Sequence, residues 1–241
     1  MKSMLAVAGT IADYERIFEA ERLVHYPVVD AFEERMGAAI ARHKLEDAAR
    51  VLACPLKTNP PNWQHGRVLY AWARAYAERL TDRSVRVLDI GTAKGFSALC
   101  LLWAFQDAGC QGHFHSLDVL DPLGRVRRNT VVEHDGFKTL AETLAPWPEA
   151  MLIQFHQSTG LAWLMSNTLA INCAFIDGKH DGDVVLKEGK LIADRQESGD
   201  VVMFDDVHIP GVARAVSMLD CFDVEYLEVK PERKYAIGVR R

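Results

Sequence analysis

Apolar residues recur at helical spacing through the first 80 residues of the chain. An apolar stripe that repeats every three to four residues is typical of a helix that packs one face against a core. Prolines and asparagines at 59–62 interrupt the pattern, and Pro61 with Asn62 suits a helix start. We therefore predict an N-terminal helical segment, residues 1–80, that caps the rest of the chain or closes over it as a lid. The three apolar groups are Ile11, Tyr14, Phe18 and Leu23; Phe32, Met36 and Ile40; and Val68, Leu69, Trp72, Tyr76 and Leu80.

From residue 85 the pattern changes to short apolar runs separated by helical stretches. This alternation is typical of repeated strand–helix units on a parallel sheet. A closing pair of strands joined by the turn 230–233 adds an antiparallel edge. The predicted fold is α/β, with a Rossmann-like, seven-stranded, mostly parallel sheet in a domain of residues 81–241. The predicted strands are 85–90, 113–118, 151–157, 173–177, 201–205, 222–229 and 235–239.

Composition and charge narrow the class of protein. Of 241 residues, 49% are hydrophobic and 25% charged, which is usual for a globular chain and excludes long disorder. The net charge of −5 provides no basic field for nucleic acid or an anionic membrane, so we expect neither as a partner. Five scattered cysteines without a CxxC pair fit a reducing cytoplasm, and no apolar run is long enough to span a bilayer. A small-molecule partner is expected, and a homodimer stays open.

A glycine turn follows the first predicted strand. Gly91 and Gly95 stand between the apolar run 87–90 and a predicted helix over 98–105, with Asp89 two residues before the first glycine. Glycines permit positive φ and close approach of a ligand, and a helix N-terminus offers free N–H donors. The spacing is neither GxGxxG nor a phosphate-binding Walker loop, so a plain strand–helix turn stays open.

An acid stands at the tip of the next strand. Asp118 is placed to accept hydrogen bonds from ribose hydroxyls, although a carboxylate there also suits a helix cap. Together with the glycine turn, Asp118 indicates a ligand that contains adenosine.

Carboxylates also end the later strands. Asp177 follows one apolar run, and Asp205 with Asp206 follows another. Adjacent parallel strands end at one edge about 4.8 Å apart, so these acids are expected to converge. Their repulsion requires protons or a cation, and a set of oxygen ligands suits Mg²⁺. Helix capping or contact with the cofactor is the alternative role.

Two of these segments resemble the class I S-adenosylmethionine-dependent methyltransferases. VLDIGTAKGFSA, residues 87–98, looks like the first motif of that family, and HSLDV, residues 115–119, looks like its second. The resemblance covers about residues 85–241. It implies contacts to the methionine part and the ribose of S-adenosylmethionine, and a third-strand segment, 154–159, that passes the adenine. The implied cofactor-binding residues are Asp89, Gly91, Gly95, Ser97, Asp118, Ser158 and Asp177.

The later acids are similar to those of the cation-dependent, catechol O-methyltransferase-like group. In that group an acid on the fourth strand and an Asp-Asn pair on the fifth hold the ion, which implies Asp177, Asp205 and Asp206 as ligands here. Asp206 stands where the group has asparagine. His180 stands where the group has a lysine base, and Lys179 competes with it for this role. The DGxH sequence also resembles a broader group of small-molecule and sugar methyltransferases.

The combined prediction is an S-adenosylmethionine-dependent O-methyltransferase for a small hydroxylated acceptor, assisted by Mg²⁺. A metal polarises a hydroxyl, and a histidine takes up its proton near neutral pH. Metal-independent methyl transfer, an NAD(P)-type oxidoreductase and a non-catalytic adenosine-binding protein are the alternatives.

Overall fold

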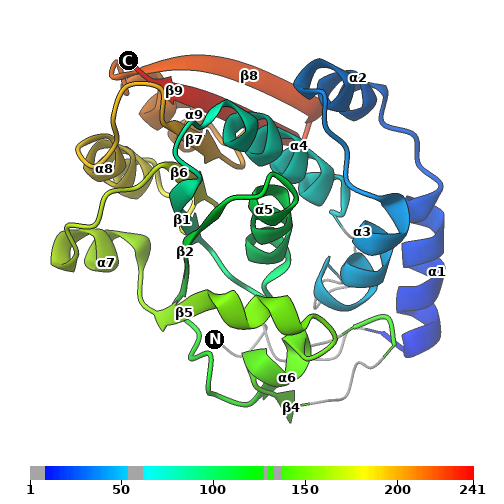
Figure 1. The fold of residues 1–241 in the computed structure, drawn as a ribbon. Helices are drawn as coiled ribbons and strands as arrows, with labels where there is room; N and C mark the ends of the chain where they lie inside the picture. Colours follow the sequence, from blue (N-terminus) through cyan, green and yellow to red (C-terminus); the bar gives the residue numbers. More distant parts are fainter. Residues whose placement is uncertain (1–8, 54–61, 128–129, 133–136) are drawn as a thin grey trace.

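The computed structural model describes residues 9–53, 62–127, 130–132 and 137–241. Seven strands form one sheet in the order β5-β2-β1-β6-β7-β9-β8 (Figure 1). The first five strands of that order are parallel, whereas β9 runs antiparallel to both β7 and β8. The predicted fold class is therefore confirmed. The strands are β1 Ser84–Ile90, β2 Gln111–Asp118, β5 Ile153–Gln157, β6 Cys173–Ile176, β7 Val201–Phe204, β8 Phe222–Lys230 and β9 Arg233–Arg240.

Helices cover both faces of this sheet (Figure 1). Helices α4 and α5 pack on one face, and α7, α8 and α9 pack on the other. A small ribbon of β3 (Val126–Arg127) and β4 (Phe137–Lys138) lies outside the sheet. The helices are α1 Ile11–Arg22, α2 Pro27–Met36, α3 Arg42–Ala48, α4 Gln64–Arg79, α5 Phe96–Asp107, α6 Leu140–Leu144, α7 Gly160–Ser166, α8 Gly182–Ala193 and α9 Pro210–Ser217.

Alternating side chains along the strands build the two halves of the core. Val87 of β1 joins the core under α4 and α5, and its neighbour Leu88 joins the core under α7 to α9. Successive side chains of a strand point to opposite faces, so a sheet covered on both sides needs apolar residues at nearly every position. This explains why the central strands read as continuous apolar runs.

The N-terminal helices share a core with the sheet. Phe18 of α1 and Phe32 of α2 are buried in the same cluster as α4 and α5. Leu23, however, is 74% exposed, and Ile40 lies beyond α2, which ends where Gly37 adopts φ +67°. The predicted signals at 59–61 lie outside the described residues, and α4 begins at Gln64, two residues after Asn62. A lid role for residues 1–80 stays a prediction.

Two of the shifted boundaries have a local chemical cause. Met151 lies in a 3-10 turn, Pro148–Leu152, rather than in a strand, and is 88% exposed. Proline fixes the backbone for the first turn of a helix, so β5 begins only at Ile153. Helix α5 begins at Phe96 instead of Ala98, because Gly95 is its N-cap with φ +88°.

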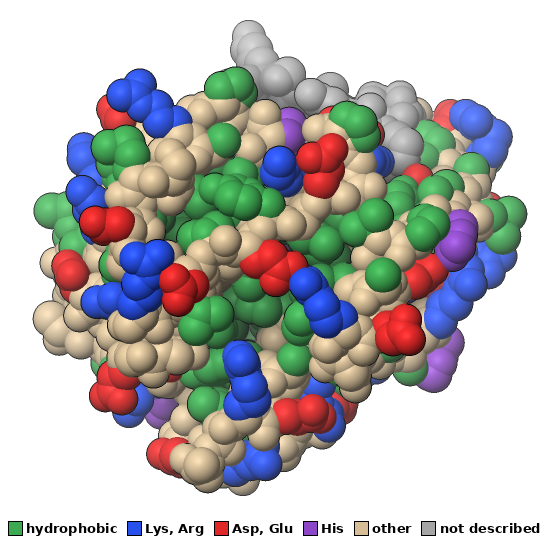
Figure 2. Space-filling view, turned by 90° about the horizontal axis from the view of Figure 1, so that it is seen from above, with side chains coloured by type: hydrophobic (Ala, Val, Ile, Leu, Met, Phe, Trp, Pro, Cys, Tyr) green, Lys and Arg blue, Asp and Glu red, His purple; other side chains and the backbone are tan. Residues whose placement is uncertain are grey.

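The surface carries mixed charge. On the face shown in Figure 2, side chains of Lys and Arg alternate with those of Asp and Glu across the described residues. No helix in the described part of the chain is long and apolar enough to cross a membrane.

Candidate functional site

The glycine turn joins the carboxyl ends of three strands. Gly91 adopts φ +112°, and its N–H donates to the Leu117 carbonyl of β2 at 2.8 Å. A Cβ at Gly91 would lie 2.2 Å from the backbone oxygen of Asp177, which follows β6. The turn therefore requires glycine twice, for its backbone conformation and for its contact with the Asp177 segment.

Asp89 is buried beneath this turn. The Ser116 hydroxyl donates to its Oδ2 at 2.5 Å, while Oδ1 has no hydrogen-bond partner among the described residues. Burial raises the pKa of Asp89 to about 6, although Ser116 and Ser97 favour the ionised form. Ser97 itself is buried on the first turn of α5. A buried carboxylate oxygen without a partner suits a cationic ligand group.

Asp118 forms hydrogen bonds to the glycine turn, to the residues just after β2 and to the end of β5. Its carboxylate accepts from the Ala93 N–H at 2.7 Å and from the Leu120 N–H at 2.9 Å. Its backbone carbonyl accepts from the Ser158 N–H at 2.8 Å, so β5 ends beside it. The hollow next to Asp118 has a volume of about 10 Å³, room for one water, so an adenosine requires it to widen.

Two predicted residues near the turn have local partners. The Ser158 hydroxyl donates to the Thr159 carbonyl at 3.0 Å. Gly95 faces the Leu144 side chain of α6, which lies 3.1 Å from where a Cβ would stand. Both residues lie at the predicted edge of the sheet, and their contacts to a cofactor stay a prediction.

The three predicted metal ligands do not converge on one point. Within the described residues, ligand atoms close together form two groups: Asp177 and Asp205 with His65, and Asp177 and Asp206 with His180. Atoms in each group lie within 4.8 Å of one another. Burial, and then the charges of Asp205 and Asp206, raise the pKa of the half-buried Asp177 well above its ordinary range.

Arg233 joins the pair of neighbouring carboxylates. Its Nη1 donates to Asp205 Oδ2 at 2.6 Å and to Asp206 Oδ1 at 3.0 Å. Burial alone would lower the pKa of Arg233, but the two carboxylates outweigh it and raise that pKa. With its amide oxygen turned to the guanidinium, Asn62 accepts from Nε at 3.1 Å and from Nη2 at 3.0 Å. The sequence pattern predicts Arg233 within the turn 230–233 and gives it no role at the site.

His65 and Tyr235 lie on the buried side of the Asp205–Asp206 pair. His65 Nδ1 lies 3.8 Å from Asp205 Oδ2 and 3.1 Å from the Tyr235 hydroxyl. Burial, and then the nearby charge of Arg233, lower the pKa of His65 to about 3, so its ring is neutral. Neither residue is predicted from the sequence as part of the site, since His65 lies at the start of a helix and Tyr235 belongs to an apolar strand pattern.

Of the two candidate bases, His180 reaches the carboxylates. Its Nδ1 lies 3.1 Å from Asp206 Oδ2, and 41% of its side chain is exposed. Lys179 is 71% exposed and lies with its Nζ 3.5 Å from Asp181 Oδ2. His208 lies on the opposite side of Asp206, with its Nδ1 3.7 Å from Oδ1.

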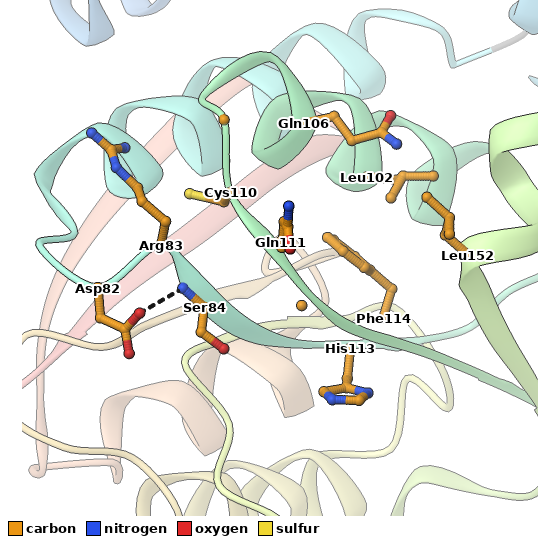
Figure 3. A pocket seen from close by; sticks show the side chains of 12 residues that line it. Asp82, Arg83, Ser84, Leu102, Gln106, Cys110, Gln111, His113, Phe114 and Leu152 are labelled. Atoms are coloured by element: carbon orange, nitrogen blue, oxygen red, sulfur yellow. Dashed lines mark hydrogen bonds between the residues drawn. The ribbon is translucent and has the colours of Figure 1, made fainter.

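A larger hollow of about 970 Å³ lies at the amino ends of β1 and β2 (Figure 3). Its charged side chains are bonded to the backbone: Asp82 accepts from the Ser84 N–H at 2.9 Å, and Arg83 donates to the carbonyls of Ala77 and Ala108. This hollow is at the opposite end of the strands from the glycine turn. The glycine turn and the predicted base lie at the carboxyl ends of the strands, so this edge of the sheet is the candidate active site.

Comparison with known proteins identifies the type of domain and the fold. A family model described as a methyltransferase domain matches residues 88–207. No curated protein matches the sequence. The fold is similar to that of methyltransferase PaMTH1 from Podospora anserina bound to S-adenosylhomocysteine (15% identity, TM-score 0.59), with 88% of this chain and 94% of that chain covered.

Two O-methyltransferases have the same fold. TomG from Streptomyces achromogenes, involved in tomaymycin synthesis and bound to S-adenosylmethionine, shares 18% identity with a TM-score of 0.57, over 84% of this chain and 91% of that chain. The O-methyltransferase from Bacillus cereus, bound to S-adenosylhomocysteine, shares 12% identity with a TM-score of 0.52. The match covers 88% of this chain and 91% of that chain. The motifs, the fold and the family match define a class I methyltransferase. The chain is an S-adenosylmethionine-dependent methyltransferase.

Proposed function

We propose that this enzyme moves a methyl group from S-adenosylmethionine to a hydroxyl group of a small-molecule acceptor. The observation that carries the proposal is the position of His180. Its loop follows Asp177, whose backbone touches the glycine turn at Gly91, and its ring lies beside Asp206 at the same edge of the sheet. A general base is therefore adjacent to the segment expected to hold the cofactor.

The residues of the glycine turn and its neighbours would bind the cofactor. Asp89, with its unpartnered oxygen, suits the ammonium group of the methionine part, with Gly91, Gly95 and Ser97 around it. Asp118 would accept from the ribose hydroxyls, and Ser158 would border the adenine. Bound S-adenosylmethionine supplies an activated methyl group.

His180 would take the proton of the acceptor hydroxyl. With Nδ1 toward Asp206, Nε2 would receive the proton of the acceptor, as in a base oriented by a carboxylate. Lys179, held toward Asp181, is the weaker candidate. The half-exposed His180 ring is accessible to an acceptor that arrives from solvent.

The magnesium ion predicted from the motifs has no step in this proposal. Mg²⁺ prefers oxygen ligands in near-octahedral geometry, and a bound ion would lower the pKa of the acceptor hydroxyl. In the described part of the chain the three carboxylates divide into two groups, and Arg233 bridges Asp205 and Asp206. The residues present therefore do not fit a three-carboxylate magnesium site.

Substitution of the base tests the proposal. We expect His180→Ala to lower methyl transfer from tritiated S-adenosylmethionine to a panel of small hydroxylated compounds by about 10²- to 10⁴-fold. The affinity for S-adenosylhomocysteine, measured by calorimetry, should stay within about twofold, because the ring belongs to the acceptor side.

His208→Ala is the matched control, since this histidine also faces Asp206 but from the other side. We expect less than about a tenfold loss in that variant. Equal activity of His180→Ala and the unmodified enzyme would contradict the assignment of the base.

A further inference from the structure

The carboxylate pair already has a cation, the guanidinium of Arg233. Its Nη1 lies at 2.6 Å from Asp205 Oδ2 and at 3.0 Å from Asp206 Oδ1, the two oxygens that a bridging ion would have to share. The other oxygens are engaged as well. Asp205 Oδ1 accepts from the Asp206 N–H at 2.7 Å, and Asp206 Oδ2 lies 3.1 Å from His180.

The surroundings hold this guanidinium in place. Only 22% of the Arg233 side chain is exposed, and the Asp205 side chain is 1% exposed. Asn62 accepts from the two remaining nitrogens, so the donors on all three are used in fixed directions. A planar guanidinium with several directed donors binds two carboxylates in a defined geometry, which a hydrated surface lysine does not do.

The charge balance of the site is a second observation that favours Arg233 as the cation of the carboxylate pair. Asp205 and Asp206 are consecutive, so two acidic side chains stand next to each other at the site. Arg233 contributes one positive charge within hydrogen-bond distance of both. Arg233 also lies beyond residues 88–207, the stretch that matches the methyltransferase family model. The compensating charge therefore comes from a part of the chain that the motifs do not cover.

We propose that Arg233 takes the place of a divalent cation at this site, as a positioning residue that holds Asp206 in the orientation required by His180. This inference rests on the proposed function for its reaction. It makes methyl transfer by this enzyme independent of added metal. Arg233 contacts Asp206, and Asp206 contacts His180. These two contacts replace the connection that a metal ion would make to the base.

Binding of Mn²⁺ tests this inference without an acceptor. Free Mn²⁺ is followed by electron paramagnetic resonance during titration of the metal-free enzyme and of Arg233→Gln. We expect no saturable site in the unmodified enzyme at millimolar Mn²⁺. Arg233→Gln should acquire one saturable site, at least about tenfold tighter than the detection limit set with the unmodified enzyme, because Asp205 and Asp206 then lack the guanidinium that bridges them.

Two further variants keep the result interpretable. Arg241→Gln makes the same substitution at an exposed ion pair with Asp223 just beyond β9, and should behave as the unmodified enzyme. Arg233→Lys keeps the charge, and should bind no Mn²⁺ even if Arg233→Gln fails to fold. Circular dichroism verifies the fold of each variant.

A saturable Mn²⁺ site in the unmodified enzyme, or in folded Arg233→Lys, would overturn the inference. So would a folded Arg233→Gln without such a site, or loss of methyl transfer when the unmodified enzyme is treated with a chelator. Failure of the proposed function would be seen separately, as absence of S-adenosylhomocysteine binding, because the Mn²⁺ titration needs no cofactor.

Discussion

Asp206 has an unusual backbone for its residue type. It adopts φ +52°, a left-handed conformation that costs a residue with a side chain roughly 1–2 kcal/mol. Such strain persists where the surrounding contacts determine the position, and here those contacts come from Arg233, Asp205 and His180. The conformation directs one carboxylate oxygen to the guanidinium and the other to the imidazole. In the proposed arrangement Asp206 therefore links Arg233 to His180.

The pKa of Asp89 predicts a pH dependence of cofactor affinity. Above about pH 6 this carboxyl group is ionised and attracts the ammonium group of the cofactor; below about pH 6 it is protonated and neutral. Calorimetric affinity for S-adenosylhomocysteine should therefore fall by up to about tenfold per pH unit as the pH drops below 6. Asp89→Asn should remove this dependence, and an equally steep decline in that variant would contradict the assignment.

The raised pKa of Asp89 also makes the free energy of unfolding depend on pH, in the opposite direction to cofactor affinity. The value in the folded enzyme lies above the ordinary value of 3.8, so the protonated carboxyl is favoured by folding. The contribution of Asp89 to the free energy of unfolding is therefore greatest at low pH and is lost as the pH rises through about 6.

The individual residues of the site differ in how far the sequence predicts them. Asp177, Asp205 and His180 follow apolar runs, and the carboxyl ends of parallel strands meet at one edge, so their proximity is predictable. Arg233 and His65 reach the same place from the final hairpin and from α4. Nothing in their local pattern marks them, because their role depends on tertiary contacts: His65 meets Tyr235 across 170 residues, and Arg233 meets Asp205 across 28.

At the scale of elements, the turn after β1 is the most constrained connection of the site. It contacts the end of β2 through hydrogen bonds and the end of β6 through direct backbone contact at Gly91. The strands themselves were predictable, because burial on both faces gives continuous apolar runs. The ends of the strands were less predictable. The strand predicted to start at Met151 begins at Ile153, because Pro148 starts a helical turn just before it.

Alanine at Gly91 should destabilise the fold strongly. We expect a loss of about 3 kcal/mol or more, from left-handed backbone strain and from overlap of the new Cβ with the Asp177 carbonyl. Gly109→Ala is the control, because Gly109 also has a positive φ, +73°, but no atom within 4 Å of its Cβ position. That variant should lose about 1 kcal/mol. Urea unfolding measures both, and equal losses would contradict the close packing of the turn.

At the scale of the whole molecule, the strand order determines where the site lies. The chain runs outward from β1 to β2 and β5, then returns to β6 on the other side of β1. In open α/β sheets, ligands bind in the crevice outside the carboxyl ends of the strands, where this reversal occurs. Gly91 after β1 and Asp177 after β6 lie in contact at this point of reversal. The alternation of strands and helices predicts this architecture, but the packing of the N-terminal helices depends on tertiary contacts such as those of Phe18 and Phe32.

The most direct test of the account is a calorimetric titration of the unmodified enzyme with S-adenosylhomocysteine, repeated with Asp118→Ala. The account predicts binding at one site per chain with micromolar or tighter affinity, weakened at least about tenfold in Asp118→Ala, since the ribose would lose a charged hydrogen-bond acceptor. Absence of binding at millimolar ligand, or identical affinity in the two proteins, would contradict a cofactor site at the carboxyl ends of β1 and β2.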